Sequence, residues 1–381
     1  MNLKTLAGTI AVLGVMALAA CSTGATSGSN ASPAASQNSA AAASFLNQKI
    51  TGTAGPNGEK PMPVADLSLT PADITKLRAG HYTAALLWHQ SSAFVTAVQS
   101  GAEAEFQRLG IGVTATAQAN MDAGTQANQV RTALVRKPSA IISLPVDPVS
   151  AAQAFNPAAK QGVKLVFLSN FPKGYTYGQQ YASIVTDDLY QMGKRAAEAL
   201  GNALGGKGTV GMIYYDAQYY VTNERDAAFK TTLESDFPGI KIVAEQGFSD
   251  PSATTSIASA MLTQHPNLDG IYVSYSEPAA EGVLSALRTV NDTHTKLVTL
   301  DLDNPVVVDM ATGGNTVAVV ADQAWNLGKG MADAAALALL GQKAPAFAVA
   351  GALTITKTDI AQGYQQSLHT GVPSAVASVL K

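Results

Sequence analysis

The chain has 381 residues and a formal net charge of −3, and charged residues make up only 13% of it, against about 25% in an average soluble protein. This length allows about two domains, and the charge provides no basic field for nucleic acid. The single cysteine, Cys21, has no partner for a disulfide. The five histidines have no metal-ligand spacing, so we expect no metal and no cofactor.

The first 21 residues have the order of an export signal. Lys4 precedes an apolar stretch over residues 6–18, and the letters LAAC follow at 18–21. This ending resembles the lipobox of bacterial lipoproteins, in which the cysteine is acylated and becomes the first mature residue. The apolar stretch is short for a bilayer span. We therefore expect a lipoprotein signal peptide at 1–21 and a lipid anchor on Cys21 that holds the protein on a membrane of the cell envelope, at its periplasmic or extracellular face. An ordinary signal peptide with a chance cysteine, or a core helix, is the alternative.

Residues 22–80 are predicted to be a flexible tether followed by a pre-domain segment. Residues 22–44 are small, polar and uncharged, a composition that cannot offset the entropy of ordering. The stretch 45–80 is transitional. Within it, Thr70 followed by Pro71 predicts a helix start, with threonine as N-cap and proline as the first helical residue, and a short helix to about Leu77.

From residue 81 onward, short β-branched apolar runs alternate with amphipathic stretches. The alternation predicts an α/β fold of two doubly wound parallel-sheet lobes. The expected strands begin near Tyr82, Gly112, Ala140, Lys164, Thr209, Lys241, Gly270, Lys296 and Thr316. In such sheets, ligands bind beyond the carboxyl ends of the strands. The loops after the strands are therefore the places where a binding site is expected.

Motifs for catalysis are not evident. The run GNALGGK at 201–207 has most of a phosphate-binding loop, but it follows a helix and precedes a strand, so we interpret it as a glycine-rich helix end. The pairs at 187–188 and 301–304 could be paired carboxylates or a cation site. We interpret Asp188 and Asn304 as helix caps instead. No nucleophile with its base is visible, so the chain is not predicted to be an enzyme.

The strand-end motifs in chain order resemble those of the ribose-type (type I) periplasmic sugar-binding proteins of bacterial ABC transporters. The motifs are QSSAF at 90–94, SLPVD at 143–147, NERDAAF at 223–229, LD at 300–301 and ADQ at 321–323. The resemblance implies two lobes joined by three hinge crossovers, near 184–187, 322 and 350–352. It implies an N-terminal lobe of 81–186 with 323–351 and a C-terminal lobe of 187–322 with 352–381.

The resemblance, together with the chemistry of sugars, implies a set of ligand-binding residues. Sugar hydroxyls need carboxylate, amide and guanidinium partners, and sugar C–H faces need aromatic rings. The predicted set is Trp88, Gln90, Ser91, Ser92, Phe94, Ser169, Asn170, Tyr219, Arg225, Tyr275, Asp301 and Asp322. Four positions depart from the family. Ser169-Asn170 replaces an Asp-Arg pair, Tyr275 replaces an asparagine, and Asp322 replaces an amide.

These departures narrow the expected ligand. A cleft containing Arg225, Asp301 and Asp322 has one net negative charge, which disfavours anions and is compatible with a neutral sugar or polyol, or with a cation. Losing the Asp-Arg pair favours a ligand smaller or less hydroxylated than a pyranose. We therefore expect a monomeric solute-binding lipoprotein that delivers a sugar or polyol to ABC permease subunits. A sensory protein that binds a non-sugar molecule and signals through a membrane receptor has the same sequence features. An enzyme that uses the cleft carboxylates is a third, less supported class.

Overall fold

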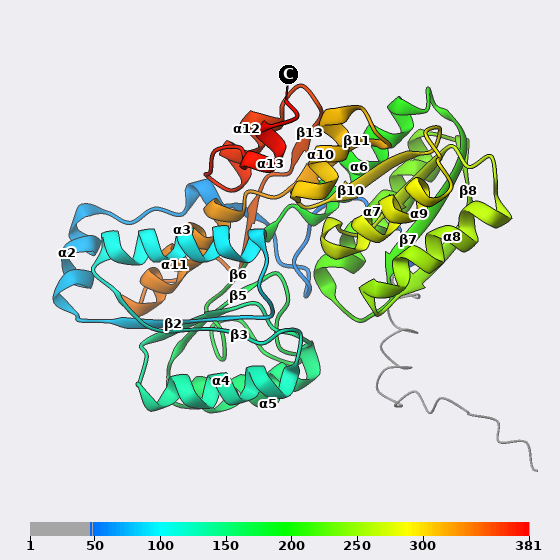
Figure 1. Cartoon of the computed structure of the whole chain (residues 1–381). Helices are drawn as coiled ribbons and strands as arrows, with labels where there is room; N and C mark the ends of the chain where they lie inside the picture. The colour runs from blue at the N-terminus through cyan, green and yellow to red at the C-terminus, as the bar shows by residue number, and fades with distance from the viewer. Residues whose placement is uncertain (1–45, 48, 381) are drawn as a thin grey trace, which may run out of the picture.

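Two lobes, each built on a mostly parallel sheet between helices, make up the protein (Figure 1). The computed structural model describes residues 46–47 and 49–380, so the predicted signal peptide and Cys21 lie outside the described residues. The predicted fold class is confirmed. Within the described part of the chain, no helix is both long and apolar enough to cross a membrane.

The first lobe contains a parallel sheet with the strand order β1-β12-β6-β5-β4-β2-β3. Its strands are β1 (Met62–Pro63), β12 (Phe347–Ala350), β6 (Ser183–Asp187), β5 (Lys164–Leu168), β4 (Ala140–Ser143), β2 (Thr83–Trp88) and β3 (Gly112–Gln118). Helices α3 (Ala93–Leu109) and α11 (Ala324–Leu339) cover one face, and α4 (Ala123–Val135) and α5 (Pro148–Lys160) cover the other. Because side chains alternate along a strand, Leu86 belongs to the core under α3 and α11, whereas Leu87 belongs to the core under α4 and α5.

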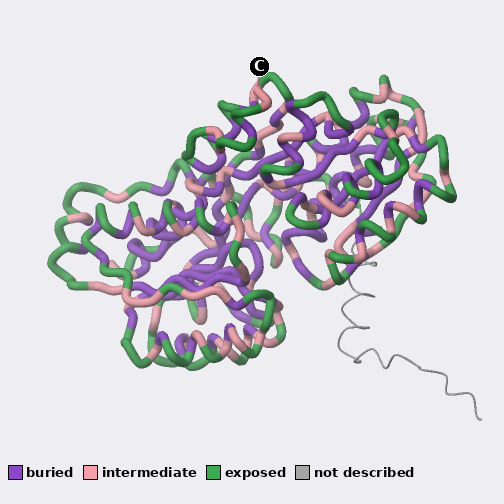
Figure 2. Tube along the Cα trace, in the orientation of Figure 1, coloured by how far each residue is buried: buried purple, intermediate pink, exposed green. Residues whose placement is uncertain are grey.

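The second lobe contains a sheet with the order β13-β11-β10-β9-β7-β8, in which only the β11–β13 pair is antiparallel. Its strands are β7 (Lys207–Tyr215), β8 (Gly239–Phe248), β9 (Gly270–Val273), β10 (Lys296–Leu300), β11 (Thr316–Ala321) and β13 (Leu353–Ile355). Its helices are α6 (Leu189–Ala203), α7 (Tyr220–Asp236), α8 (Thr254–Gln264), α9 (Glu281–Thr289), α10 (Asn304–Thr312), α12 (Ile360–Ser367) and α13 (Ser374–Ala377). In both lobes the central strands are buried and the outer helix faces are exposed (Figure 2).

The chain passes between the two sheets at three short connections. It leaves the first sheet at the end of β6 and begins α6 with Asp188 as N-cap, as predicted. It returns through residues 322–323 between β11 and α11, and it leaves again through residues 351–352 between β12 and β13. These connections are the crossovers that the family resemblance implied.

Close helix packing makes each lobe compact. In the first lobe, a Cβ on Gly328 of α11 would lie 1.8 Å from the carbonyl oxygen of Val98 in α3, and one on Gly101 would lie 2.0 Å from that of Trp325. In the second lobe, a Cβ on Gly193 of α6 would lie 2.1 Å from the carbonyl oxygen of Arg225 in α7. Only glycine allows these backbone approaches.

Local predictions for the helix ends were mostly correct. Thr70 caps α2 (Pro71–Ala79) by accepting a hydrogen bond from the Asp73 amide, and the helix extends slightly beyond the predicted Leu77. The run at 201–207 is a helix end, as interpreted: α6 ends at Ala203, and β7 begins at Lys207. The prediction for Asn304 was wrong. Asp303 is the N-cap of α10, and the Asn304 side chain instead accepts a hydrogen bond of 2.6 Å from the Tyr364 hydroxyl.

Candidate functional site

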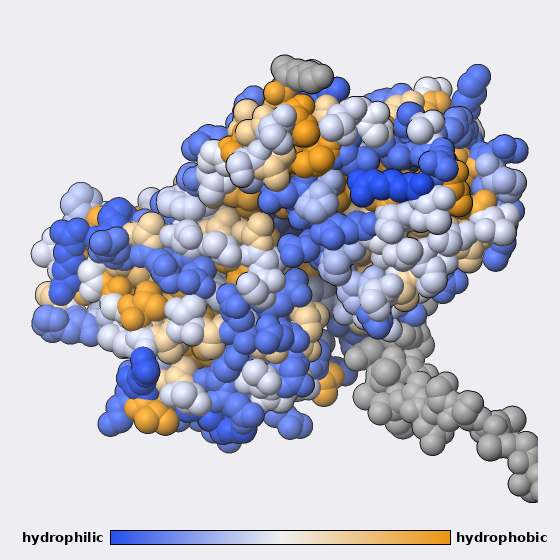
Figure 3. Space-filling view, in the orientation of Figure 1, coloured by the Kyte–Doolittle hydropathy of each residue, from blue (hydrophilic) through white to orange (hydrophobic). Residues whose placement is uncertain are grey.

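A cavity of about 220 Å³ lies between the two lobes, where the carboxyl ends of their parallel strands meet. The space-filling view shows the hollow between the lobes (Figure 3). Residues from both lobes and from the connection at 322 line this pocket, as expected for a doubly wound fold. The lining includes His89, Gln90, Ser92, Phe94, Met121, Ser169, Asp187, Tyr215, Tyr219, Thr222, Arg225, Tyr275, Ser276, Glu277, Asp301 and Asp322.

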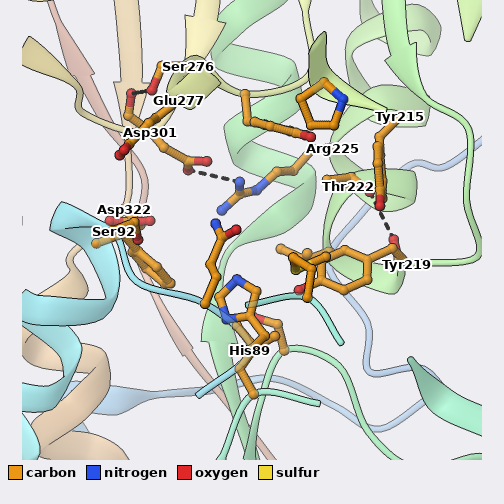
Figure 4. Close-up of a pocket in the computed structure, with 18 of the residues that line it drawn as sticks. His89, Ser92, Tyr215, Tyr219, Thr222, Arg225, Ser276, Glu277, Asp301 and Asp322 are labelled. Atoms are coloured by element: carbon orange, nitrogen blue, oxygen red, sulfur yellow. Dashed lines mark hydrogen bonds and ion pairs between the residues drawn. The ribbon is translucent and has the colours of Figure 1, made fainter. Parts of the chain in front are cut away.

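Arg225 is the central charged residue of the pocket (Figure 4). It extends from the first turns of α7. Its Nη2 atom donates to Asp187 Oδ2 at 2.9 Å, and its Nη1 atom donates to Asp301 Oδ1 at 2.9 Å. Asp187 ends β6 of the first lobe and Asp301 follows β10 of the second, so the guanidinium joins two lobes. The Arg225 and Asp187 side chains are buried, and Asp301 is partly exposed to the pocket.

The protonation of the cluster follows from burial and from the crowding of three carboxyl groups around one guanidinium. Burial raises the pKa of Asp322 well above its usual range, and the negative charges of Asp187 and Asp301 raise it further. Burial raises the pKa of Asp187 to about 6, against the opposing effect of Arg225. One guanidinium therefore faces three carboxyl groups, so acidic groups outnumber basic groups in the cluster.

Aromatic side chains of the second lobe form one wall of the pocket. The Tyr215 ring lies 5.9 Å from that of Tyr219 and 5.8 Å from that of Tyr275, both edge-on, and Phe248 packs behind Tyr215 and Tyr275. Burial raises the pKa of Tyr215, so its hydroxyl stays uncharged at neutral pH. This wall offers apolar ring faces beside the polar Arg225 cluster.

Three lining residues have backbones in the left-handed region, of which Met121, with φ of 59°, is the first. Ser169, after β5, has φ of 54°, and Asp301, after β10, has φ of 67°, a region that non-glycine residues seldom adopt. Each of the latter two is held by the neighbouring strand: the Ser169 amide donates to Val185 O and the Asp301 amide donates to Val320 O, both at 2.9 Å. Such conformations cluster at functional sites, where the surrounding structure enforces them.

The structure brings nine of the predicted residues to the pocket, namely Gln90, Ser92, Phe94, Ser169, Tyr219, Arg225, Tyr275, Asp301 and Asp322. What they bind there remains a prediction. Three others do not line it. Trp88 is fully buried under α3, where its indole Nε1 donates to Gln99 at 3.1 Å. Ser91 is exposed outside the cavity.

Asn170, the third of these, is a contact between lobes instead of a lining residue. Its buried side chain accepts a hydrogen bond of 3.3 Å from the Val221 amide of the second lobe, and its Nδ2 atom is 3.4 Å from Pro145 O. The amide is thus engaged by backbone on both sides and does not face the cavity.

Several lining residues were not predicted, notably His89, Asp187, Tyr215, Thr222 and Glu277. Asp187 had a visible signal, because it ends a buried run just before the crossover, but the pair Asp187-Asp188 was interpreted only through the capping role of Asp188. His89 is fully buried, which lowers its pKa to about 3 and keeps it neutral. In the described part of the chain, no group of histidine, cysteine or acidic residues could hold a metal ion.

Residues 83–343 match the family described as the periplasmic binding protein domain. No curated protein matches the chain. Among solved structures, a solute-binding protein of an ABC transporter from Mycobacterium smegmatis with bound glycerol has 26% identity and a TM-score of 0.67, covering 77% of this chain and 100% of its own. The corresponding protein from Agrobacterium vitis, bound to α-D-tagatopyranose, has 22% identity and a TM-score of 0.67, with 78% and 99% covered. One from Bacillus halodurans with bound myo-inositol has 19% identity and a TM-score of 0.63, with 73% and 96% covered.

Proposed function

The chain belongs to the periplasmic binding protein family, and from this premise we propose that it captures a small sugar or polyol between its lobes and delivers it to an ABC importer. The predicted resemblance is confirmed by the family match, as is the expectation of a binding protein and not an enzyme. The structural neighbours from M. smegmatis, A. vitis and B. halodurans hold glycerol, a hexose and an inositol, so polyhydroxylated ligands recur among proteins of this fold.

The observation that carries the proposal is the buried polar cluster around Arg225. Among the described residues, Oδ1 of Asp187, Oδ2 of Asp322 and Nε of Arg225 are buried and have no hydrogen-bond partner. Unpaired buried polar atoms are costly, and they are rare in native proteins. A ligand hydroxyl both donates and accepts, so adjacent hydroxyl groups would satisfy these atoms together.

Charge and size restrict the ligand further. The carboxyl groups of Asp187 and Asp301 outnumber the one guanidinium between them, so an anionic ligand would be repelled. The cavity of about 220 Å³ is smaller than the roughly 300–1,000 Å³ of pockets for drug-sized molecules. A short polyol or a small sugar, with C–H faces against Tyr215 and Tyr275, fits both restrictions.

Ligand capture would proceed by closure of the two lobes. A molecule that contacts the first lobe at Gln90 and the second lobe at Asp301 favours the arrangement in which both lie within reach. The extent of closure follows from the difference in affinity between the closed and open arrangements. Affinity at about the micromolar level, roughly −8 kcal/mol, is attainable with a few charge-assisted hydrogen bonds and a stacked ring.

The proposal includes the placement of the protein and its lobe boundaries. Binding proteins of ABC importers work outside the cytoplasm, and we propose that a lipid on Cys21 holds this one at the membrane as a monomer beside its permease. Replacing Cys21 with serine should release the protein from the membrane fraction. We also propose lobes of 81–186 with 323–351 and of 187–322 with 352–381; the first observed connection follows Asp187, one residue beyond this division, and β1 also joins the first sheet.

A thermal-shift screen tests the proposed function. The protein is refolded to remove bound ligand and mixed with pentoses, hexoses, polyols, nucleosides and small cationic metabolites. A true ligand at a hundredfold excess over its Kd stabilises the fold by about 2.7 kcal/mol. Asp301→Asn should weaken that ligand by about ten- to hundredfold, because a charged acceptor is lost. Asp147→Asn, at the cap of α5 outside the pocket, is the matched control and should leave Kd unchanged. No shift with any sugar or polyol would contradict the proposal.

A further inference from the structure

The segment ahead of the family domain connects the two lobes a fourth time. We define the N-terminal strap as residues 46–47 and 49–63, which end with β1. The family match begins only at residue 83, so the strap lies outside it. In Figure 1 this segment runs between the lobes before it reaches α2. None of its contacts is needed for the pocket chemistry described above.

The first half of the strap is attached to the second lobe. Leu46 is buried in the core that α6 and α7 form with their sheet, and Lys230 of α7 donates to Asn47 Oδ1 at 3.1 Å. Farther along, the Thr53 hydroxyl donates to Asp188 Oδ1, and the Tyr220 hydroxyl donates to Ala54 O at 2.6 Å.

The second half of the strap is attached to the first lobe. A turn closes where the Gly55 amide donates to Glu59 O at 2.8 Å, and Glu59 Oε1 accepts from the buried Tyr181 at 3.3 Å. Met62 and Pro63 then pair in parallel with Ala348 and Val349 of β12. The strap thus holds one lobe with its first half and the other lobe with its second half.

The contacts on the second lobe lie beside the ligand pocket. Asp188, which Thr53 contacts, follows the lining residue Asp187, and it also caps α6 at the first crossover. Tyr220 stands between the lining residues Tyr219 and Val221 at the start of α7. A motion that separates the lobes must therefore break these bonds, stretch the turn at 55–59, or unpair β1.

We propose that the N-terminal strap is a fourth interlobe connection that restricts opening of the cleft and so raises the fraction of molecules competent to bind ligand. The apparent affinity is proportional to the fraction of molecules that are competent to bind. A strap that changes the ratio of open to closed molecules therefore changes the apparent Kd without contacting the ligand. Two hydrogen bonds of ordinary strength correspond to about a 5- to 150-fold change in that ratio.

Interlobe distances in the absence of ligand test the strap directly and do not depend on the proposed function. The full chain receives Cys21→Ser and spin labels at Thr132→Cys in α4 and Ser256→Cys in α8, two exposed positions on opposite lobes. Distance distributions are compared with and without Thr53→Val and Tyr220→Phe, which remove one hydroxyl each and keep the side-chain shape. We expect the pair of changes to lengthen and broaden the distribution.

Tyr175→Phe is the matched control, because the Tyr175 hydroxyl also donates to a backbone carbonyl, Ala152 O at 3.0 Å, but both residues belong to the first lobe. It should leave the distribution unchanged. Identical distributions in the parent and the double variant would overturn the proposal, as would an equal change in the control. If the double variant does not fold, each single variant is measured against the same control, with the same two readings.

Discussion

Replacing Arg225 with methionine should lower the free energy of unfolding by about 3–5 kcal/mol at pH 7.5, because it leaves buried carboxylates without a counter-charge. Methionine approximates the volume of the arginine stem, so the loss is mainly electrostatic. Arg225 is 4% exposed, and it is paired at 2.9 Å with both Asp187 and Asp301, of which Asp187 is 1% exposed. Arg225 now offsets the free-energy cost of removing the Asp187 and Asp301 carboxylates from water, and in the variant nothing would offset that cost.

The variant should recover part of this loss at pH 5. Without Arg225, the folded-state pKa of Asp187 rises above its present value of about 6, so the protein takes up a proton as the pH falls, and the buried charge disappears. Urea unfolding without ligand at both pH values measures the effect. Arg288→Met is the control: Arg288 is 60% exposed and 3.5 Å from Asp309, and its loss should cost less than about 1 kcal/mol. Equal losses for the two variants, or a larger Arg225 deficit at pH 5, would refute the reasoning.

Two further outcomes are expected. Burial raises the pKa of Asp226 and of Asp303 to about 7, so the folded state holds more protons than the unfolded state between about pH 4 and 8. The urea concentration at the unfolding midpoint should therefore fall as the pH rises through that window. Asp226→Asn should make this fall less steep, and an unchanged slope would argue against the assignment. Gly328→Ala should lower the melting temperature, because the added Cβ would lie 1.8 Å from Val98 O. Gly124→Ala, on the exposed side of α4, is the control and should raise the melting temperature slightly. An unchanged melting temperature for Gly328→Ala would contradict the close packing of α3 and α11.

The lobes could be predicted from sequence because their strands are continuous apolar runs. Strands β3, β4, β5, β9, β10 and β11 begin at the predicted residues, and β2, β7 and β8 begin within a residue or two of them. A continuous apolar run identifies a strand, but it does not show which side chains point to which face of the sheet. Nearly every position of β2 is buried, since helices cover both faces of the sheet, so no alternation showed that Trp88 faces α3 and not the cleft.

Pocket residues could be predicted only where the sequence of a single strand-end loop identified them, without knowledge of their partners in the other lobe. Arg225 was predicted because it lies in the motif at 223–229 and because a guanidinium is a suitable partner for ligand hydroxyls. Its partner Asp187 lies 38 positions earlier and comes from the other sheet, and only the folded chain brings the two together. The prediction that Asn170 binds the ligand was wrong for the same reason, because the Val221 amide that donates to its side chain belongs to the other lobe.

The discontinuous first lobe has a consequence for the newly made chain. Strand β6 is complete at residue 187, but α11, which covers one face of that sheet, begins at residue 324, and β12 follows it. At a synthesis rate of about 5–20 residues per second, roughly 7–27 s separate the end of β6 from the start of α11. Throughout that interval, Leu86, Ile142 and Val166 have only part of their cover. The first lobe therefore cannot complete its core until α11 and β12 have been made.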